Sequence, residues 1–151
     1  EEKLQIVAAA VKAVDVRVPV YAGTGCVTTK ETIELSLAVK ALGGVDCLSV
    51  ISPYFVAVSQ DDIYRHYSSV AKAVDLPILL YNIPGRTGNN IDWKTVKRLA
   101  SFENIIGIKD SSGNFDNTLK YIENTDPSIQ VLMGSDSLIL WARDCQVKCV
   151  N

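Results

Sequence analysis

Two residues suited to carbonyl chemistry stand at the ends of short apolar runs. Lys109 directly follows Ile105–Ile108, and Tyr81 closes the run Ile78–Tyr81. Burial disfavours a charged ammonium, so a lysine in such a place keeps some neutral amine, the form that attacks a carbonyl to give a Schiff base. A neighbouring phenol can relay the protons of that reaction. The alternatives are that Lys109 reaches solvent or pairs with Asp110, and that Tyr81 lies at the rim of a core.

Two glycine-containing turns offer groups that could hold an anion. Pro84–Gly88 places Arg86 between two glycines, and the guanidinium fork matches a carboxylate. The alternative for Arg86 is a solvated loop residue. Gly23–Gly25 is a second candidate, although it is too short for a dinucleotide fingerprint. Its alternative role is the packing of a tight strand-to-helix turn.

Five short apolar runs, rich in β-branched residues, predict the strands that position these groups. Their centres lie 24 to 30 residues apart, and each run is too short for a helix. The runs are Val18–Ala22, Leu48–Ile51, Ile78–Tyr81, Ile105–Ile108 and Val131–Met133. A sixth run, Val147–Val150, extends the series.

Helical patterns fill the intervals between the runs. A capping box at Thr28 opens a helix that should end at Gly43 and turn an apolar set inward, namely Ile33, Leu37 and Leu42. Further helices are expected over Leu4–Val14, from Ser59 to about Val74, from Asp92 to Leu99, and from Asn114 to a point before Pro127.

Strands that alternate with helices at this spacing predict βαβ units and a parallel sheet. The nearly all-apolar runs fit strands that are covered on both faces. A (β/α)₈ barrel and an open, doubly wound sheet both satisfy the pattern, and periodicity does not separate them. A barrel needs about 250 residues, so a barrel of 151 residues would be a fragment of five to six strand–helix units. In both architectures functional residues lie at the carboxyl ends of the strands.

The composition is that of an ordinary globular protein and excludes several classes. Hydrophobic residues make up 48% and charged residues 21%, and the net charge is −2. This leaves none of the basic footprint of nucleic-acid binding. No apolar run approaches the ~20 residues of a membrane span, and the first residues, EEKLQ, are not a secretory signal. We expect one cytoplasmic domain over residues 1–151, with neither a nucleic acid nor a membrane as its partner.

The cysteines and the single histidine do not form a metal-ligand pattern. Cys26 and Cys47 lie in apolar surroundings and should behave as small core residues. Cys145 and Cys149 have no histidine nearby, so we expect no metal site and reduced thiols. His66 is expected on the surface of a helix.

Two longer motifs give the sequence a family resemblance. They are Tyr81–Gly88, which reads YNIPGRTG, and Gly107–Asp110, which reads GIKD. Supporting pieces are Ala22–Gly25, Ser52–Tyr54 and Gly134–Asp136. Over residues 1–140 the sequence resembles the dihydrodipicolinate synthase / N-acetylneuraminate lyase family of class I aldolase-type barrels.

The resemblance implies a (β/α)₈ barrel, usually a homotetramer built from dimers. It implies that Lys109 forms a Schiff base with pyruvate, that Tyr81 transfers protons, and that Thr87 and Gly134 lie at substrate-binding positions. Arg86 favours the synthase branch, in which an arginine of this loop binds the carboxylate of the aldehyde. The implied reaction condenses pyruvate with aspartate-4-semialdehyde to 4-hydroxy-tetrahydrodipicolinate in lysine biosynthesis. The resemblance implies no cofactor other than the pyruvate imine on Lys109.

The sequence departs from the family pattern in three places. Phe55 stands where synthases carry a tyrosine that relays protons in the neighbouring subunit's site. We expect residues 1–151 to form a partial barrel that lacks the first two strands, with their Thr-Thr-Gly relay, and most of the C-terminal end. Such a chain should be inactive alone. The tail Trp141–Asn151 also departs from the pattern.

Two alternatives stay open. Phe55 favours a related pyruvate aldolase, such as N-acetylneuraminate lyase, 2-keto-3-deoxygluconate aldolase or a hydratase-aldolase, whereas Arg86 opposes it. The alternative from a different class is a non-catalytic α/β module that holds a small anion at Gly23–Gly25.

Overall fold

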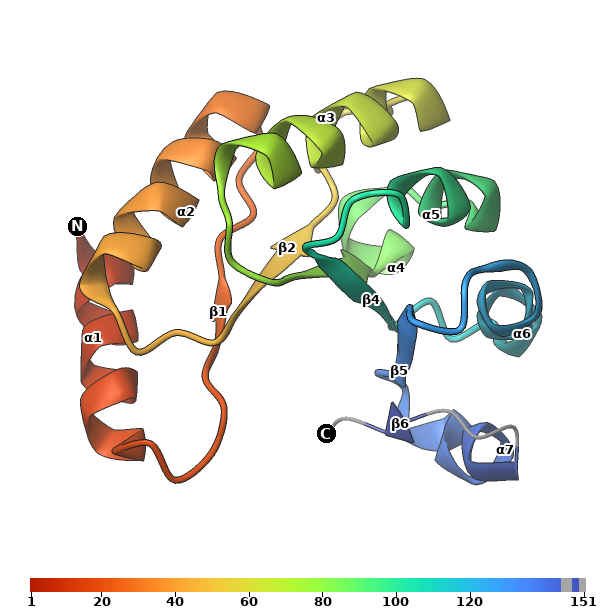
Figure 1. Cartoon of the computed structure of the whole chain (residues 1–151). Coiled ribbons are helices and arrows are strands. Elements are labelled where there is room, and N and C mark those ends of the chain that lie inside the picture. Colours follow the sequence, from red (N-terminus) through yellow and green to blue (C-terminus); the bar gives the residue numbers. More distant parts are fainter. Residues whose placement is uncertain (145–147, 150–151) are drawn as a thin grey trace.

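The computed structural model describes residues 1–144 and 148–149 and shows a single parallel sheet (Figure 1). Its strands are β1 (Tyr21–Gly23), β2 (Cys47–Ile51), β3 (Ile78–Asn82), β4 (Ile105–Asp110), β5 (Gln130–Met133) and β6 (Lys148–Cys149). Each strand pairs in parallel with the next one along the chain. Each of the five predicted runs overlaps one of the strands β1 to β5, so their prediction is confirmed.

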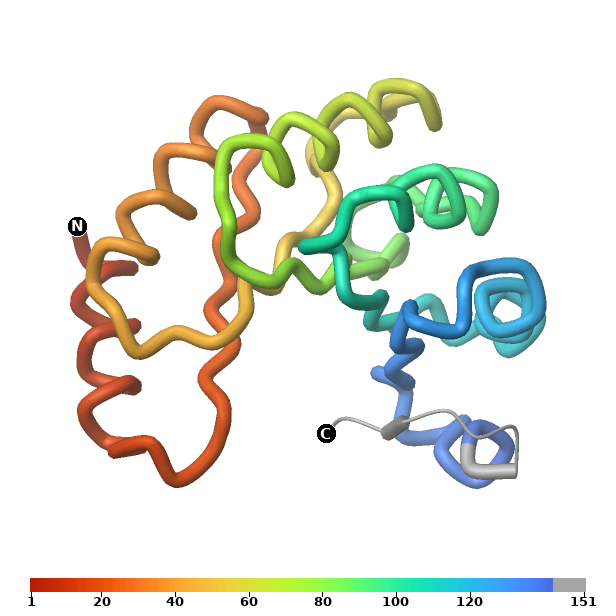
Figure 2. Tube along the Cα trace, viewed as in Figure 1, coloured from red at the N-terminus to blue at the C-terminus, as the bar shows by residue number. Residues whose placement is uncertain are grey.

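The order of the strands separates the two architectures that periodicity left open, and it confirms the barrel that the family resemblance implied. A doubly wound sheet reverses its strand order at a switch point and carries helices on both faces. The described strands never reverse their order, and the helices form an arc around one side of the sheet (Figures 1 and 2). This is the winding of a (β/α)₈ barrel, of which the chain forms five to six strand–helix units. The open-sheet alternative is wrong.

The structure describes seven helices, four of which begin where their capping residues predicted. They are α1 (Glu2–Val14), α2 (Thr29–Leu42), α3 (Gln60–Ala73), α4 (Pro84–Thr87), α5 (Trp93–Leu99), α6 (Phe115–Asn124) and α7 (Ile139–Asp144), with a 3₁₀ turn over Asp136–Leu138. Four of them begin at a side chain that accepts a hydrogen bond from a backbone N–H of the first turn: Thr28, Ser59, Asp92 and Asn114. These caps fix the helix starts because they satisfy donors that the helix itself leaves free.

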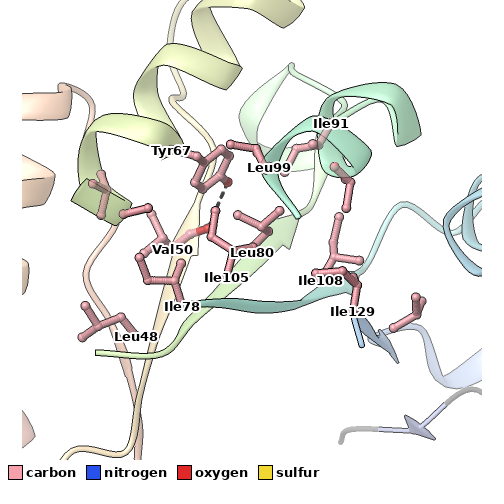
Figure 3. Packing of buried hydrophobic residues seen from close by; sticks show 14 of the residues in the cluster. Leu48, Val50, Tyr67, Ile78, Leu80, Ile91, Leu99, Ile105, Ile108 and Ile129 are labelled. Atoms are coloured by element: carbon pink, nitrogen blue, oxygen red, sulfur yellow. Dashed lines mark hydrogen bonds between the residues drawn. The ribbon is translucent and has the colours of Figure 1, made fainter. Parts of the chain in front are cut away.

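The core lies between the sheet and its helices (Figure 3). Alternate residues of the central strands are fully buried there, namely Leu48, Val50, Ile78, Leu80 and Ile108. The hydroxyl of Tyr67 on α3 donates a 3.0 Å hydrogen bond to the carbonyl oxygen of Val50, which ties the helix to β2. Because successive side chains of a strand point to opposite faces, burying this set directs the intervening residues to the inner face of the sheet.

Helix α2 does not bury the face that its apolar residues predicted. Leu37 and Leu42 are 43% and 44% exposed, whereas Thr32 and Ser36 are buried. The Thr32 hydroxyl donates a 2.9 Å hydrogen bond to a backbone carbonyl oxygen one turn earlier. The Ser36 hydroxyl donates a 2.9 Å hydrogen bond to the hydroxyl of Thr24. Small side chains with satisfied hydroxyls let the helix lie close to the sheet, and an apolar pattern does not reveal such a face.

The predicted sixth run is only partly covered by the structure. Lys148–Cys149 form β6, while Val147 and Val150 lie outside the described residues, as does Cys145. Cys47 is buried, and this burial raises the pKa of its thiol to about 11. Cys26 is half-buried, and both thiols are free. None of the described helices combines the length and the apolar character that a membrane crossing needs.

His66 is buried, and its predicted surface position is wrong. The side chain is only 2% exposed because α2 lies alongside this part of α3. Its Nδ1 lies 2.9 Å from the Thr29 hydroxyl, and its Nε2 has no hydrogen-bond partner among the described residues. Burial lowers the pKa of the imidazole to about 4.

We expect the free energy of unfolding to fall as the pH drops from about 6.5 to 4. In this window the unfolded chain protonates its histidine, whose ordinary pKa is 6.5, whereas the folded protein keeps His66 neutral until about pH 4. The loss at pH 4 approaches about 3 kcal/mol. Urea denaturation at a series of pH values measures it. His66→Gln should flatten the curve between about pH 6.5 and 5, because the sequence contains a single histidine; the same slope in the variant would contradict the assignment.

Candidate active site

The inner face of the sheet opens into a hollow of about 440 Å³. Its lining comes from side chains that alternate with the core residues and from the turn after β1: Tyr21, Gly23, Gly25, Ser49, Ile51, Leu79, Tyr81, Lys109 and Leu132. Leu79 and Leu132 form a small apolar cluster with Cys47. Tyr81 and Lys109 stand nearer the carboxyl ends of the strands, which is where a barrel carries its functional groups.

Tyr81 and Lys109 lie side by side on neighbouring strands. The register of β3 and β4 pairs the two residues, and Nζ of Lys109 lies 4.7 Å from the centre of the Tyr81 ring. Both side chains are half-buried and line the hollow. An amine beside a phenol in a partly enclosed hollow is the pair that imine chemistry uses. The prediction that the two residues are neighbours is confirmed, while their catalytic roles stay predictions.

Asp110 does not neutralise Lys109. Its carboxylate lies on the opposite face of β4 and is 1% exposed. None of the ion pairs formed by the described residues includes either side chain. The two-residue period of the strand separates them. The pairing of Lys109 with Asp110, one of the alternatives from the sequence, is therefore wrong.

Gly134 leaves room for the Lys109 side chain. It follows β5, and its N–H donates a 2.9 Å hydrogen bond to the carbonyl oxygen of Asp110. A methyl group at Gly134 would lie 2.8 Å from Cε of Lys109 and would collide with the hydroxyl of Ser111. Gly134 therefore shapes the surroundings of the amine by having no side chain, and its contact with substrate stays a prediction.

Arg86 and Thr87 lie in α4, the short helix directly after β3. Gly88 ends this helix with a φ of 75°, a left-handed conformation that glycine adopts without strain. The Arg86 side chain is exposed at this end of the sheet. The Thr87 hydroxyl is buried and lies 2.9 Å from the carbonyl oxygen and 3.1 Å from the N–H of Asn89, so it holds the loop together. Substrate contacts of both residues stay predictions.

Asn89, which the sequence analysis missed, fastens this loop to the loop after β2. Its Nδ2 donates to the carbonyl oxygens of Pro53 and Val56, both at 2.9 Å, and its Oδ1 accepts from the N–H of Val58 at 3.0 Å. Phe55 lies within the fastened loop, 91% exposed and with a φ of 78°. The one sign of this connection in the sequence was a pair of asparagines, Asn89 and Asn90, directly after the loop glycine Gly88.

Two residues of the turn Gly23–Gly25 are closely packed. Thr24 is fully buried, its N–H donates to the carbonyl oxygen of Ser49, and its hydroxyl accepts from Ser36. A side chain at Gly25 would collide with Ile51. These contacts favour the tight-turn role over an anion cradle.

Asn82 and Asp110 form a second pair that the sequence analysis missed. They occupy the register position after Tyr81 and Lys109, face the helices, and are joined by a 3.0 Å hydrogen bond. The sign in the sequence was that each residue is polar and stands two positions beyond a buried residue of its apolar run, Leu80 or Ile108. Among the described side chains, those of residues 1–142, no group of three acidic, histidine or cysteine side chains is arranged to hold a metal ion.

Comparison with known sequences identifies relatives along nearly the whole chain. The profile of the Dihydrodipicolinate synthetase family matches residues 1–145. The 4-hydroxy-tetrahydrodipicolinate synthase of Listeria monocytogenes serotype 4a is 44% identical over 140 residues, which cover 93% of this chain and 48% of that protein. The chain thus spans about half the length of the curated relatives that it matches.

Solved structures show the same arrangement. The dihydrodipicolinate synthase of Bacillus anthracis superposes with a TM-score of 0.95 and 37% identity, over 99% of this chain and 51% of that chain. A chloride-inhibited dihydrodipicolinate synthase from Acinetobacter baumannii, solved in complex with pyruvate, superposes with a TM-score of 0.93 and 35% identity, over 98% and 50% of the two chains. The profile match, the identity and the shared fold agree: this chain belongs to the Dihydrodipicolinate synthetase family.

Proposed function

We propose that this protein condenses pyruvate with aspartate-4-semialdehyde through a Schiff base on Lys109, giving 4-hydroxy-tetrahydrodipicolinate. The proposal rests on the Lys109 amine, held 4.7 Å from the centre of the Tyr81 ring in a hollow near the carboxyl ends of the strands. Relatives named 4-hydroxy-tetrahydrodipicolinate synthase and a neighbour solved with pyruvate support it. Because the chain spans about half the length of these relatives, the condensation is proposed for the whole protein and imine formation for Lys109 in this chain.

The proposed reaction begins when the neutral amine of Lys109 attacks the ketone carbon of pyruvate. Water leaves as the imine forms, and Tyr81 moves the protons that this step requires. The imine draws electrons from the adjacent methyl group, which loses a proton to give an enamine. The enamine carbon then bonds to the aldehyde carbon of the second substrate; the carbonyl double bond opens, its oxygen takes up a proton to become a hydroxyl, and the imine on Lys109 re-forms. The amino group of that substrate displaces the Lys109 amine and closes the ring.

Arg86 supports the part of the proposal that concerns the aldehyde. Its exposed guanidinium stands on the loop directly after the strand that carries Tyr81. A guanidinium fork binds a carboxylate through two parallel hydrogen bonds. Aspartate-4-semialdehyde carries such a carboxylate beside its amino group, so Arg86 would orient it toward the enamine.

Localisation, oligomeric state and cofactor use are also proposed. We propose a cytoplasmic homotetramer built from dimers that needs no cofactor beyond the pyruvate imine. The exposed apolar side chains of Phe55 and Val56, on the loop after β2, support a contact with another subunit close to the site. Large exposed apolar groups are typical of interaction surfaces.

Incubation of the chain with pyruvate and borohydride should add one reduced pyruvate, and peptide mapping should place it on Lys109. Lys109 should react first because the phenol of Tyr81 lies beside its amine and can move the protons of the reaction. Intact-mass spectrometry measures the adduct. Lys109→Arg should abolish it, while Lys120→Arg, on the exposed side of α6, should retain it. A folded chain that forms no adduct, or one spread over all lysines, would contradict the proposal.

Gly134→Ala should slow adduct formation about 10- to 100-fold. The added methyl group meets Cε of Lys109 and the Ser111 hydroxyl, so the Lys109 side chain must shift from its present position. The time course of borohydride trapping measures the effect. Gly85→Ala is the matched control, because nothing lies within 4 Å of the position that its methyl group would take. Equal rates for the two variants would show that Gly134 does not position the lysine.

In the whole protein, Arg86→Lys should raise the KM for aspartate-4-semialdehyde about 10- to 100-fold and leave pyruvate trapping unchanged. Lysine keeps the charge but loses the two-pronged geometry. Product formation from pyruvate with aspartate-4-semialdehyde, compared with N-acetylmannosamine, measures both the effect and the choice of aldehyde. Preferential use of the sugar aldehyde would overturn the synthase assignment.

A further inference from the structure

We propose that Asp110 and Asn82 are positioning residues, which hold Lys109 and Tyr81 in the orientation that imine formation requires. The inference rests on the proposed function and assigns a task to the polar pair behind the site.

The carboxylate of Asp110 is held by hydrogen-bond donors on two sides. Its Oδ2 accepts from the hydroxyl of Thr118 at 2.7 Å, from the hydroxyl of Ser112 at 3.1 Å and from Nδ2 of Asn117 at 3.4 Å. Its Oδ1 accepts from the N–H of Ser112 at 3.1 Å and from Nδ2 of Asn82 at 3.0 Å. No cation of the described residues forms an ion pair with it. Neutral donors alone stabilise this carboxylate, so its position depends on their geometry.

The amide of Asn82 joins this carboxylate to the loop after β3. Its Oδ1 accepts from the N–H of Ile91 at 3.0 Å, and its Nδ2 lies 2.9 Å from Oδ1 of Asn90. The hydroxyl of Tyr121, on α6, lies 3.3 Å from the same Nδ2 and donates to the carbonyl oxygen of Ile91. The ends of β3 and β4, the loop after β3 and helix α6 therefore meet in one buried polar network.

The strand register links this buried polar network to the reacting side chains. Asn82 pairs with Asp110 one step beyond the pair of Tyr81 and Lys109, and the N–H of Ser111 continues the ladder with a 2.8 Å bond to the carbonyl oxygen of Asn82. A strand whose side chains are fixed on one face cannot rotate about its axis, so the side chains on the other face keep their direction. Buried polar networks of this kind specify a unique geometry when every member is satisfied.

Asp110→Asn tests the inference. An amide offers one accepting oxygen, so its NH₂ group would face donors that the carboxylate now satisfies. With saturating pyruvate, we expect borohydride trapping per folded molecule to slow about 10- to 100-fold. The pyruvate concentration for half-maximal trapping should change less than about twofold, because the network touches no part of the hollow. A purely structural role would lower the folded fraction and leave the rate per folded molecule unchanged.

Thr118→Val is the second variant, for the case in which Asp110→Asn does not fold. It keeps the size of a buried side chain and removes the shortest donor to the carboxylate. We expect a slowing of about 3- to 10-fold. Asp116→Asn is the matched control: it removes one charge from an exposed position on the same helix and should trap at the original rate.

The outcomes separate the inference from the proposed function. If the unaltered chain traps pyruvate on Lys109 and Thr118→Val traps it equally fast per folded molecule, the positioning role is overturned and the Schiff-base proposal stands. If the unaltered chain forms no adduct at Lys109, both are overturned. If the slowing is equal in Asp116→Asn, the effect is one of charge on α6 and the network is not its source.

Discussion

The register between β3 and β4 is the constraint on which the rest of the structure depends. It sets Tyr81 beside Lys109 on the inner face and Asn82 beside Asp110 on the helix face. A shift of one residue would exchange the faces and drive the lysine into the core. The buried side chains of Leu80 and Ile108 oppose such a shift, since each contributes about 1.5–3 kcal/mol by its burial. Packing on the outer face thus fixes the chemistry on the inner face.

Because each strand pairs with the next one along the chain, the inner face of the sheet is available for the site. Since the described helices all cover the outer face, the inner face is left for a hollow whose floor is apolar and whose upper part carries an amine and a phenol. Among the described strands, β1 and β6 are bonded on one side only. Unpaired strand edges readily bind further strands, and the relatives, about twice as long as this chain, have further sequence that it does not contain.

Local signals were reliable wherever the physical cause is itself local. Capping residues such as Thr28 and Ser59 satisfy the first free N–H groups of their own helices, so their positions could be predicted from neighbouring residues. Leu37 was predicted to be buried and is exposed, whereas His66 was predicted to be exposed and is buried. Both predictions were wrong because the burial depends on how α2 lies against the sheet and against α3. Apolar character alone does not show that Thr32 and Ser36, with satisfied hydroxyls, form the close contact.

The sequence by itself determined the strands β1 to β5 and the starts of four helices, because apolar runs and capping residues are short local patterns. It also singled out Lys109 and Tyr81, because each stands at the end of such a run. The barrel that the family resemblance implied became visible only in the tertiary structure, because periodicity alone also allows an open sheet. Only the structure showed that Nζ of Lys109 lies 4.7 Å from the centre of the Tyr81 ring and that Gly134 leaves room for the lysine. It alone revealed the network in which Asn82 meets Asp110, 28 residues further along the chain, and Tyr121, 39 residues further along. Hydrogen bonds over such separations depend on the packing of whole strands and helices, which no local pattern encodes.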